Sequence, residues 1–152
     1  MSRESRVTAG ALLILMPAVV YGGASILSLL IGDPGYADNE LRQDLWRAGH
    51  AHAGVLLVLP LVTLRYADEA RLPRWLKRVA RHAIPAAAIL LPAAFFLSVL
   101  SPEATEPNAM IYLAYFGAVS LAVGLLVLGA GLLRTGRHPA GAPRLTDVGS
   151  KE

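Results

Sequence analysis

The chain has 152 residues, of which 55% are hydrophobic and only 16% are charged, and its formal net charge is +3. This charge is too sparse to cover a water-soluble fold of this length, and charged side chains are absent from four long segments. Because the sequence has no cysteine, disulfides, iron–sulfur clusters and cysteine nucleophiles are excluded. We therefore expect an all-α integral membrane protein in contact with the lipid bilayer.

Four apolar segments predict four transmembrane helices, at residues 7–31, 46–64, 82–100 and 109–133. Each is close to or longer than the roughly 20 residues that a helix needs to cross a bilayer. The first segment is too long for the core of a cleaved signal peptide and no Ala-x-Ala site follows it, which favours a permanent anchor. The sequence thus predicts a four-helix bundle over residues 1–134 and a disordered cytoplasmic tail at 135–152.

The distribution of basic residues predicts the orientation of these helices. Twelve of the fourteen Lys and Arg residues lie on the side that holds both termini and the connection at 65–81, and only Arg42 and Arg47 lie on the other. Basic residues stay in the cytoplasm, so we expect an inner-membrane protein with both termini inside. No recognition module accompanies the basic residues, which argues against a nucleic-acid partner.

Two local patterns add to this picture. In the connection at 65–81, Trp75 and Val79 fall at helical spacing among basic residues, which predicts a short amphipathic helix on the inner leaflet. It would act as an anchor, with binding of a specific anionic lipid as the alternative. Small residues predict a packing seam on the last helix, for contacts within the bundle or in a homodimer: Ala114, Ala118 and Ala122 at four-residue spacing, with Ser120 and Gly124 beside them.

Two histidines open the second predicted span. His50 and His52 lie about 6 Å and 9 Å below Trp46 if that residue marks the membrane interface. Ionisable side chains at this depth indicate a functional site, the structural alternative being a hydrogen bond to a backbone carbonyl. Because their positions are about 200° apart on a helix, the two imidazoles cannot bind one metal together. We expect His52 to face the bundle, since its stripe continues through Leu56 and Thr63.

Other polar side chains fall at a similar depth: Tyr21, Met110 and Tyr115. Histidine with methionine is typical of Cu(I) or low-spin haem sites, and histidine with tyrosine suits proton transfer. The pattern predicts a haem- or copper-binding site in the outer leaflet around His50 or His52, with Tyr21, Met110 and Tyr115 as further candidate site residues and both phenols inside the bundle.

The segment Gly49-His50-Ala51-His52 resembles a pattern in small bacterial four-span membrane proteins. It is also distantly similar to the haem-copper oxidase catalytic subunit, in which an His-x-His helix sends one histidine to each of two haems. The resemblance implies haem ligation by His50 and His52. Those oxidases need further histidines on other helices for their haems and copper. Here the remaining histidines are His82, at the cytoplasmic end of the third span, and His138, in the tail, so an oxidase active site does not carry over.

The function expected from the sequence is therefore a redox accessory module that holds haem or copper and is not itself an enzyme. A structural membrane protein without a cofactor is the rival interpretation. A small transporter is disfavoured, because no span carries a charged residue near its midplane.

Overall fold

The computed structural model describes residues 1–135, most of which are helical. In chain order the elements are α1 (Arg3–Gly32), α2 (Pro34–Ala37), α3 (Glu40–Glu69), α4 (Arg74–Ser98), the 3-10 helix η1 (Ala109–Tyr112) and α5 (Leu113–Thr135). Four helical segments, namely α1, α3, α4 and η1 with α5, are long and apolar enough to cross a membrane. The predicted all-α architecture with four long apolar helices is confirmed. The predicted tail at 135–152 lies outside the described residues, apart from Thr135 at the end of α5.

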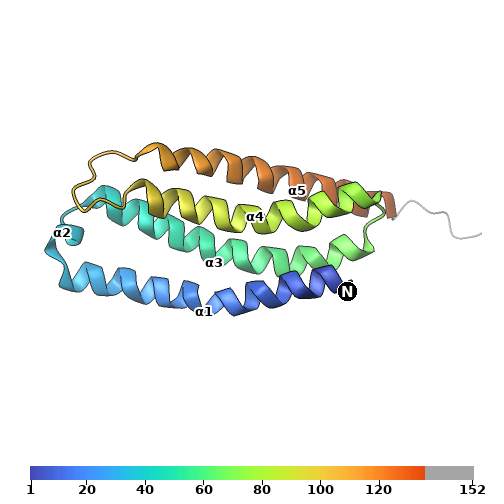
Figure 1. Ribbon diagram of the computed structural model, residues 1–152, viewed down its shortest axis with the longest axis horizontal. Helices are drawn as coiled ribbons and strands as arrows, with labels where there is room; N and C mark the ends of the chain where they lie inside the picture. The colour runs from blue at the N-terminus through green and yellow to red at the C-terminus, as the bar shows by residue number, and fades with distance from the viewer. Residues whose placement is uncertain (136–152) are drawn as a thin grey trace, which may run out of the picture.

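The four long helices run side by side and alternate in direction (Figure 1). One end of the molecule, here called the terminal end, holds the N-terminus, the connection 70–73 and the end of α5. The opposite end, here called the α2 end, holds α2 and the connection 99–108. Both ends of the described chain therefore lie at the same end of the molecule.

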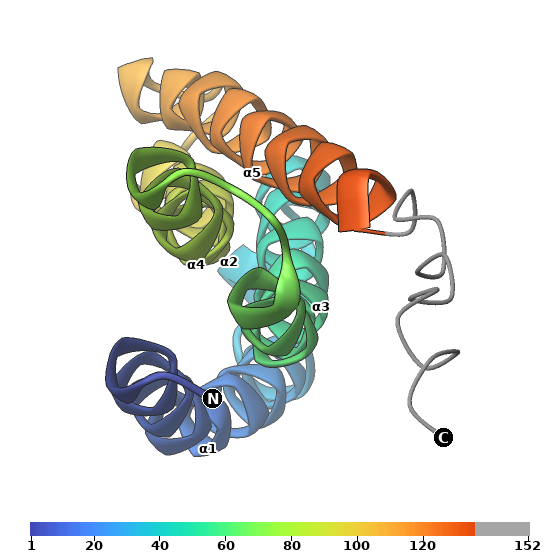
Figure 2. The ribbon, with the colours of Figure 1, turned by 90° about the vertical axis from the view of Figure 1, so that its right-hand side faces the viewer.

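The order of packing places α1 at the periphery. Figure 2 shows α1 and α5 on opposite sides of α3 and α4. Helix α4 packs against both α3 and α5, whereas α1 packs closely on α3 alone among the long helices. Only 6% of the apolar window of α1 is buried, against 39% for α4. The arrangement fits a four-helix bundle in which one side of α1 faces a groove rather than a neighbouring helix.

Glycines bring α5 close to α4. A Cβ atom at Gly117, Gly124 or Gly131 would lie 2.6–2.8 Å from a leucine or isoleucine side chain of α4 or of the connection before it. These glycines are seven residues apart and form one stripe along α5. The hydroxyl of Ser120 donates a hydrogen bond to the carbonyl oxygen of Ala83, 2.8 Å away, and joins the same two helices.

The packing seam predicted on the last helix is confirmed within the bundle at Ser120 and Gly124, and its use in a homodimer stays a prediction. Of the three alanines, Ala118 and Ala122 are exposed, and only Ala114 packs against the core. The physical reason is that glycine allows a closer backbone approach than alanine, so the glycine stripe determines which face of α5 meets α4.

The connection predicted at 65–81 is much shorter in the structure. Helix α3 continues to Glu69 and α4 already begins at Arg74, after Pro73. The basic segment around Trp75 thus forms the first two turns of α4 rather than a separate amphipathic helix. Proline suits a helix start because its fixed φ angle is already helical and no hydrogen bond needs its missing N–H.

Candidate functional site

His50 faces α1 and packs against its backbone. A Cβ atom at Gly23 would lie 2.7 Å from Nε2 and 2.8 Å from Cε1 of His50, so the imidazole occupies the space that the missing side chain leaves. The α1 backbone covers Nε2, the atom that would otherwise bind a ligand. His50 is therefore a packing residue between α1 and α3.

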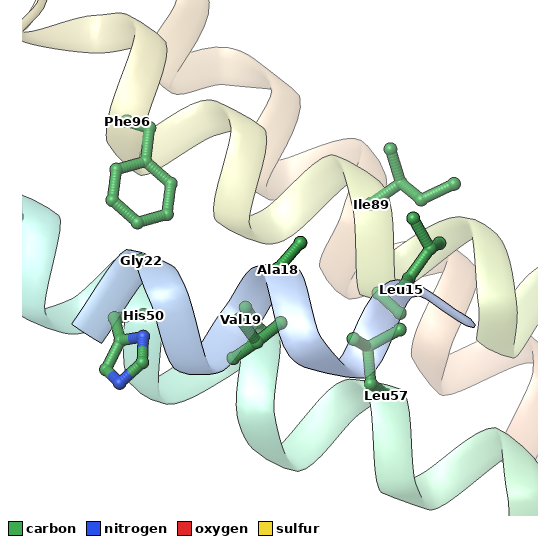
Figure 3. A pocket seen from close by; sticks show the side chains of 10 residues that line it. Leu15, Ala18, Val19, Gly22, His50, Leu57, Ile89 and Phe96 are labelled. Atoms are coloured by element: carbon green, nitrogen blue, oxygen red, sulfur yellow. The ribbon is translucent and has the colours of Figure 1, made fainter. Parts of the chain in front are cut away.

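A groove between α1, α3 and α4 adjoins this contact. Its cavity volume is about 230 Å³, and every lining residue except His50 is apolar. Figure 3 shows His50 beside the turn of α1 that holds Gly22, and Phe96 pointing from α4 toward the same turn. With one imidazole, already packed against α1, the groove suits an apolar chain better than a metal ion.

His52 lies on another face of α3 and has one ring nitrogen fixed. Its Nδ1 is 2.7 Å from the carbonyl oxygen of Ala48, and a carbonyl oxygen only accepts, so Nδ1 carries the proton. This hydrogen bond fixes the tautomer in which Nε2, and not Nδ1, is the ring nitrogen with the lone pair. The Phe95 ring of α4 holds the imidazole from the side, with 5.1 Å between the ring centroids. His52 is exposed and borders an apolar hollow of about 210 Å³ on α3.

The prediction that the two histidines point in different directions is confirmed, because they line separate cavities. The expectation that His52 faces the bundle is wrong: His50 is the partly buried residue, and His52 is exposed. Hydrophobic stripes run along both faces of α3, so their continuity did not distinguish the inner face from the outer one.

The other predicted site residues lie apart from the histidines. The exposed fractions of Tyr21, Tyr115 and Met110 are 76%, 68% and 48%, so the expectation that both phenols lie inside the bundle is wrong. Tyr115 stacks on Tyr112, with 6.2 Å between ring centroids. Helices α1 and α5 are apolar on nearly all sides, and such helices give no pattern from which their rotation can be predicted.

An aromatic cluster at the α2 end was missed by the sequence analysis. Tyr36 is fully buried and its ring centroid lies 5.5 Å from that of Trp46. The guanidinium of Arg42 lies over both rings, 4.9 Å from the Trp46 centroid and 5.6 Å from that of Tyr36. Its Nε donates to the carbonyl oxygen of Val99. The spacing of Arg42 and Trp46, four residues apart on one helix, was the available signal.

Two polar atoms in this aromatic cluster have no partner. The Tyr36 hydroxyl and the Trp46 Nε1 are buried without a hydrogen bond to any described residue. Burial raises the pKa of Tyr36, and the positive charges of Arg47 and Arg42 oppose that rise. The phenol therefore stays neutral at physiological pH.

A second polar group, at the terminal end, ties α1 to α3 and α4. One carboxylate oxygen of Asp68 accepts hydrogen bonds from the Ser5 hydroxyl (3.0 Å) and from Nη2 of Arg81 (2.7 Å), and the other accepts from the Ser2 amide (2.7 Å). Nη1 of Arg81 also donates to Glu4, 2.6 Å away. Ser5 is fully buried. Nothing in the spacing of these residues, which are up to 79 positions apart, pointed to this network.

A metal centre made of His, Cys, Asp or Glu side chains alone is not present in the described part of the chain. Within residues 1–135, no three His, Cys, Asp or Glu side chains come together as a group that could hold a metal ion. Comparison with family models, curated proteins and solved structures gives no match for this chain.

Proposed function

We propose that this protein is an inner-membrane haem-binding module that uses His52 as an axial ligand and serves as a redox accessory. The observation that carries the proposal is the hydrogen bond from His52 Nδ1 to the Ala48 carbonyl oxygen. Metal-ligating histidines regularly donate their second ring N–H to a backbone carbonyl or a carboxylate, which fixes the tautomer and aims the free nitrogen. His52 is held in this way, and His50 is not.

The hollow beside His52 fits part of a flat apolar group. Ala51, Val55 and Leu56 line it together with the imidazole. Its volume of about 210 Å³ is below the roughly 300 Å³ at which closed ligand pockets begin, so a second surface has to complete the site.

We propose a second copy of the chain as that surface, because a homodimer supplies a second His52. The other histidines described do not reach the hollow. His50 packs on α1, and His82 is 13 residues from Phe95 along α4, which corresponds to about 20 Å. Two His52 side chains facing each other would give a haem both of its axial ligands.

Haem is favoured over copper by the same surroundings. Met110, the methionine considered as a copper ligand, lies exposed in η1, so the thioether typical of a Cu(I) site is missing from the lining of the hollow. A low-spin haem would be held by two imidazoles and by apolar contacts to its ring. When bound, haem supplies one-electron transfer, while the chain holds and orients it through His52 and excludes water with apolar side chains.

The membrane placement belongs to the same proposal. Helices α1, α3, α4 and α5 would span the inner membrane, with the terminal end in the cytoplasm. The support is the hydropathy of the four helices and the excess of basic residues at the terminal end.

The proposal is tested by the visible spectrum of the protein purified in mild detergent from haem-replete cells. We expect a Soret band of low-spin haem in the wild type and its loss in His52→Ala. The matched control is His50→Ala, which removes the same side chain two positions away and should keep the band. A wild type without a Soret band, or equal loss from both variants, would contradict the proposal, and the former would favour a structural protein without a cofactor.

A further inference from the structure

A basic cavity lies at the terminal end, far from His52. Its volume is about 280 Å³, and it is lined by Arg74, Lys77, Arg78 and Arg81 from the first turns of α4 and by Glu4 of α1. Four cationic side chains therefore converge on one cavity against one carboxylate.

The ion pairs leave much of this positive charge unused. Arg81 is engaged, because its two terminal nitrogens bond to Glu4 and Asp68. Lys77 donates one of its three N–H groups to the carbonyl oxygen of Asp68. The guanidinium groups of Arg74 and Arg78 make no ion pair or hydrogen bond to any residue that the structure describes. Two complete guanidinium groups and most of an ammonium group are thus available to an anion.

The position of the cavity along α4 places it near a lipid headgroup. The basic residues occupy the start of a helix whose remaining length is apolar enough to cross a membrane. Trp75, between Arg74 and Lys77, is 65% exposed. Tryptophan is enriched at the level of the headgroups, because its ring is apolar and its N–H is polar. The cavity would then open where the phosphates of the cytoplasmic leaflet lie.

We infer that this cavity binds the headgroup of an anionic phospholipid from the cytoplasmic leaflet. Guanidinium groups offer paired N–H donors that match the oxygens of a phosphate, and each such bond is strengthened by charge. The cavity is small, which suits a single headgroup. The inference rests on the proposed membrane placement but not on haem binding.

The test is a calorimetric titration of the full-length protein in neutral detergent with dioctanoyl phosphatidylglycerol. We expect Arg74→Gln with Arg78→Gln to weaken binding by about tenfold or more. The matched control is Arg71→Gln with Arg134→Gln, which removes the same charge from exposed positions at the same end and should change the dissociation constant by less than about twofold. Glu4→Gln should tighten binding by about two- to threefold, because it removes the carboxylate that faces the cavity.

Two further titrations identify the ligand. Dioctanoyl phosphatidylcholine, which has no net charge, should bind at least about tenfold more weakly than the glycerol lipid. Inorganic phosphate should not displace the bound lipid at equal concentration. Displacement would assign the cavity to a free anion. Equal losses of lipid affinity in the two double variants would show that the positive charge of the whole end, and not this cavity, attracts the lipid. Either result, or a wild type that does not bind, overturns the inference.

The outcome is separable from that of the haem proposal. Arg74→Gln with Arg78→Gln should leave the Soret band intact, because the cavity and His52 lie on different parts of the molecule. A protein that binds the lipid but no haem would contradict only the function proposed for His52.

Discussion

The two histidines differ in the surroundings of their ring nitrogens. In His50, Nε2 lies against the α1 backbone at Gly23, whereas His52 is exposed and its other ring nitrogen, Nδ1, donates to the Ala48 carbonyl oxygen. The same residue type, two positions apart, thus serves packing in one case and is exposed with a fixed tautomer in the other.

Replacing Gly23 by alanine tests the packing role. The new Cβ would lie 2.7 Å from His50 Nε2, so the imidazole has to swing into the groove. In denaturation in detergent micelles, we expect the free energy of unfolding of Gly23→Ala to be about 1 kcal/mol below that of Gly22→Ala, which gains helix propensity without a clash. Gly22→Ala is the control, because nothing lies within 4 Å of a Cβ atom there. Equal free energies of unfolding in the two variants would mean that His50 does not pack on α1 in this way.

Tyr36 gives a test of the buried aromatic cluster. Its hydroxyl is buried without a partner, and an unsatisfied buried hydroxyl costs free energy. Tyr36→Phe should therefore leave the melting temperature unchanged or raise it, whereas Tyr36→Ala should cost about 3 kcal/mol or more by removing the ring. A loss of more than about 1 kcal/mol in the phenylalanine variant would reveal a hydrogen-bond partner for the hydroxyl.

The sequence predicts part of this residue-level picture. The angle between positions i and i+2 follows from helix geometry alone, so the different directions of His50 and His52 could be predicted. Which of the two faces α1 could not, because that choice depends on Gly23, 27 positions earlier in the chain.

At the scale of helices, their existence and number followed from the long uncharged segments, but their rotation did not. A helix surrounded by lipid is apolar on its outer side as well as its inner side, so its hydropathy pattern does not indicate which face points into the bundle. This is why Tyr21 on α1 and Ala118 on α5 were expected inside and are exposed. The heptad of glycines on α5 was the better signal, because only glycine permits the closest helix contact.

The α4–α5 contact can be tested at Gly124. A Cβ atom there would lie 2.6 Å from Cγ1 and 3.3 Å from the backbone nitrogen of Ile84, so a larger side chain has to push the helices apart. Gly124→Val should lower the free energy of unfolding by about 1–3 kcal/mol. Gly129→Val makes the same change in the same helix where a Cβ atom meets nothing within 4 Å.

Comparing the two valine variants separates packing from helix propensity. Unfolding in detergent, followed by the loss of helical circular dichroism, supplies the two free energies. If Gly129→Val were as damaging as Gly124→Val, the glycine stripe would have no special part in joining α4 to α5.

At the scale of the whole molecule, the account predicts one topology. Reporter fusions within 70–73 and at residue 152 should read cytoplasmic, and fusions within 33–39 and 99–108 should read periplasmic. The reason is the concentration of basic residues at the terminal end. A cytoplasmic signal from 33–39 would invert the molecule and place the basic cavity in the outer leaflet.

If His52 acts as proposed, two copies of the chain share one haem through this residue. The most direct measurement is the ratio of haem to chain in the purified wild-type protein, taken together with the mass of the particle in detergent. We expect one haem for every two chains, in a dimer, with the low-spin spectrum of two imidazole ligands. A dimer or monomer that carries no haem, or a monomer that carries one haem per chain, would contradict it.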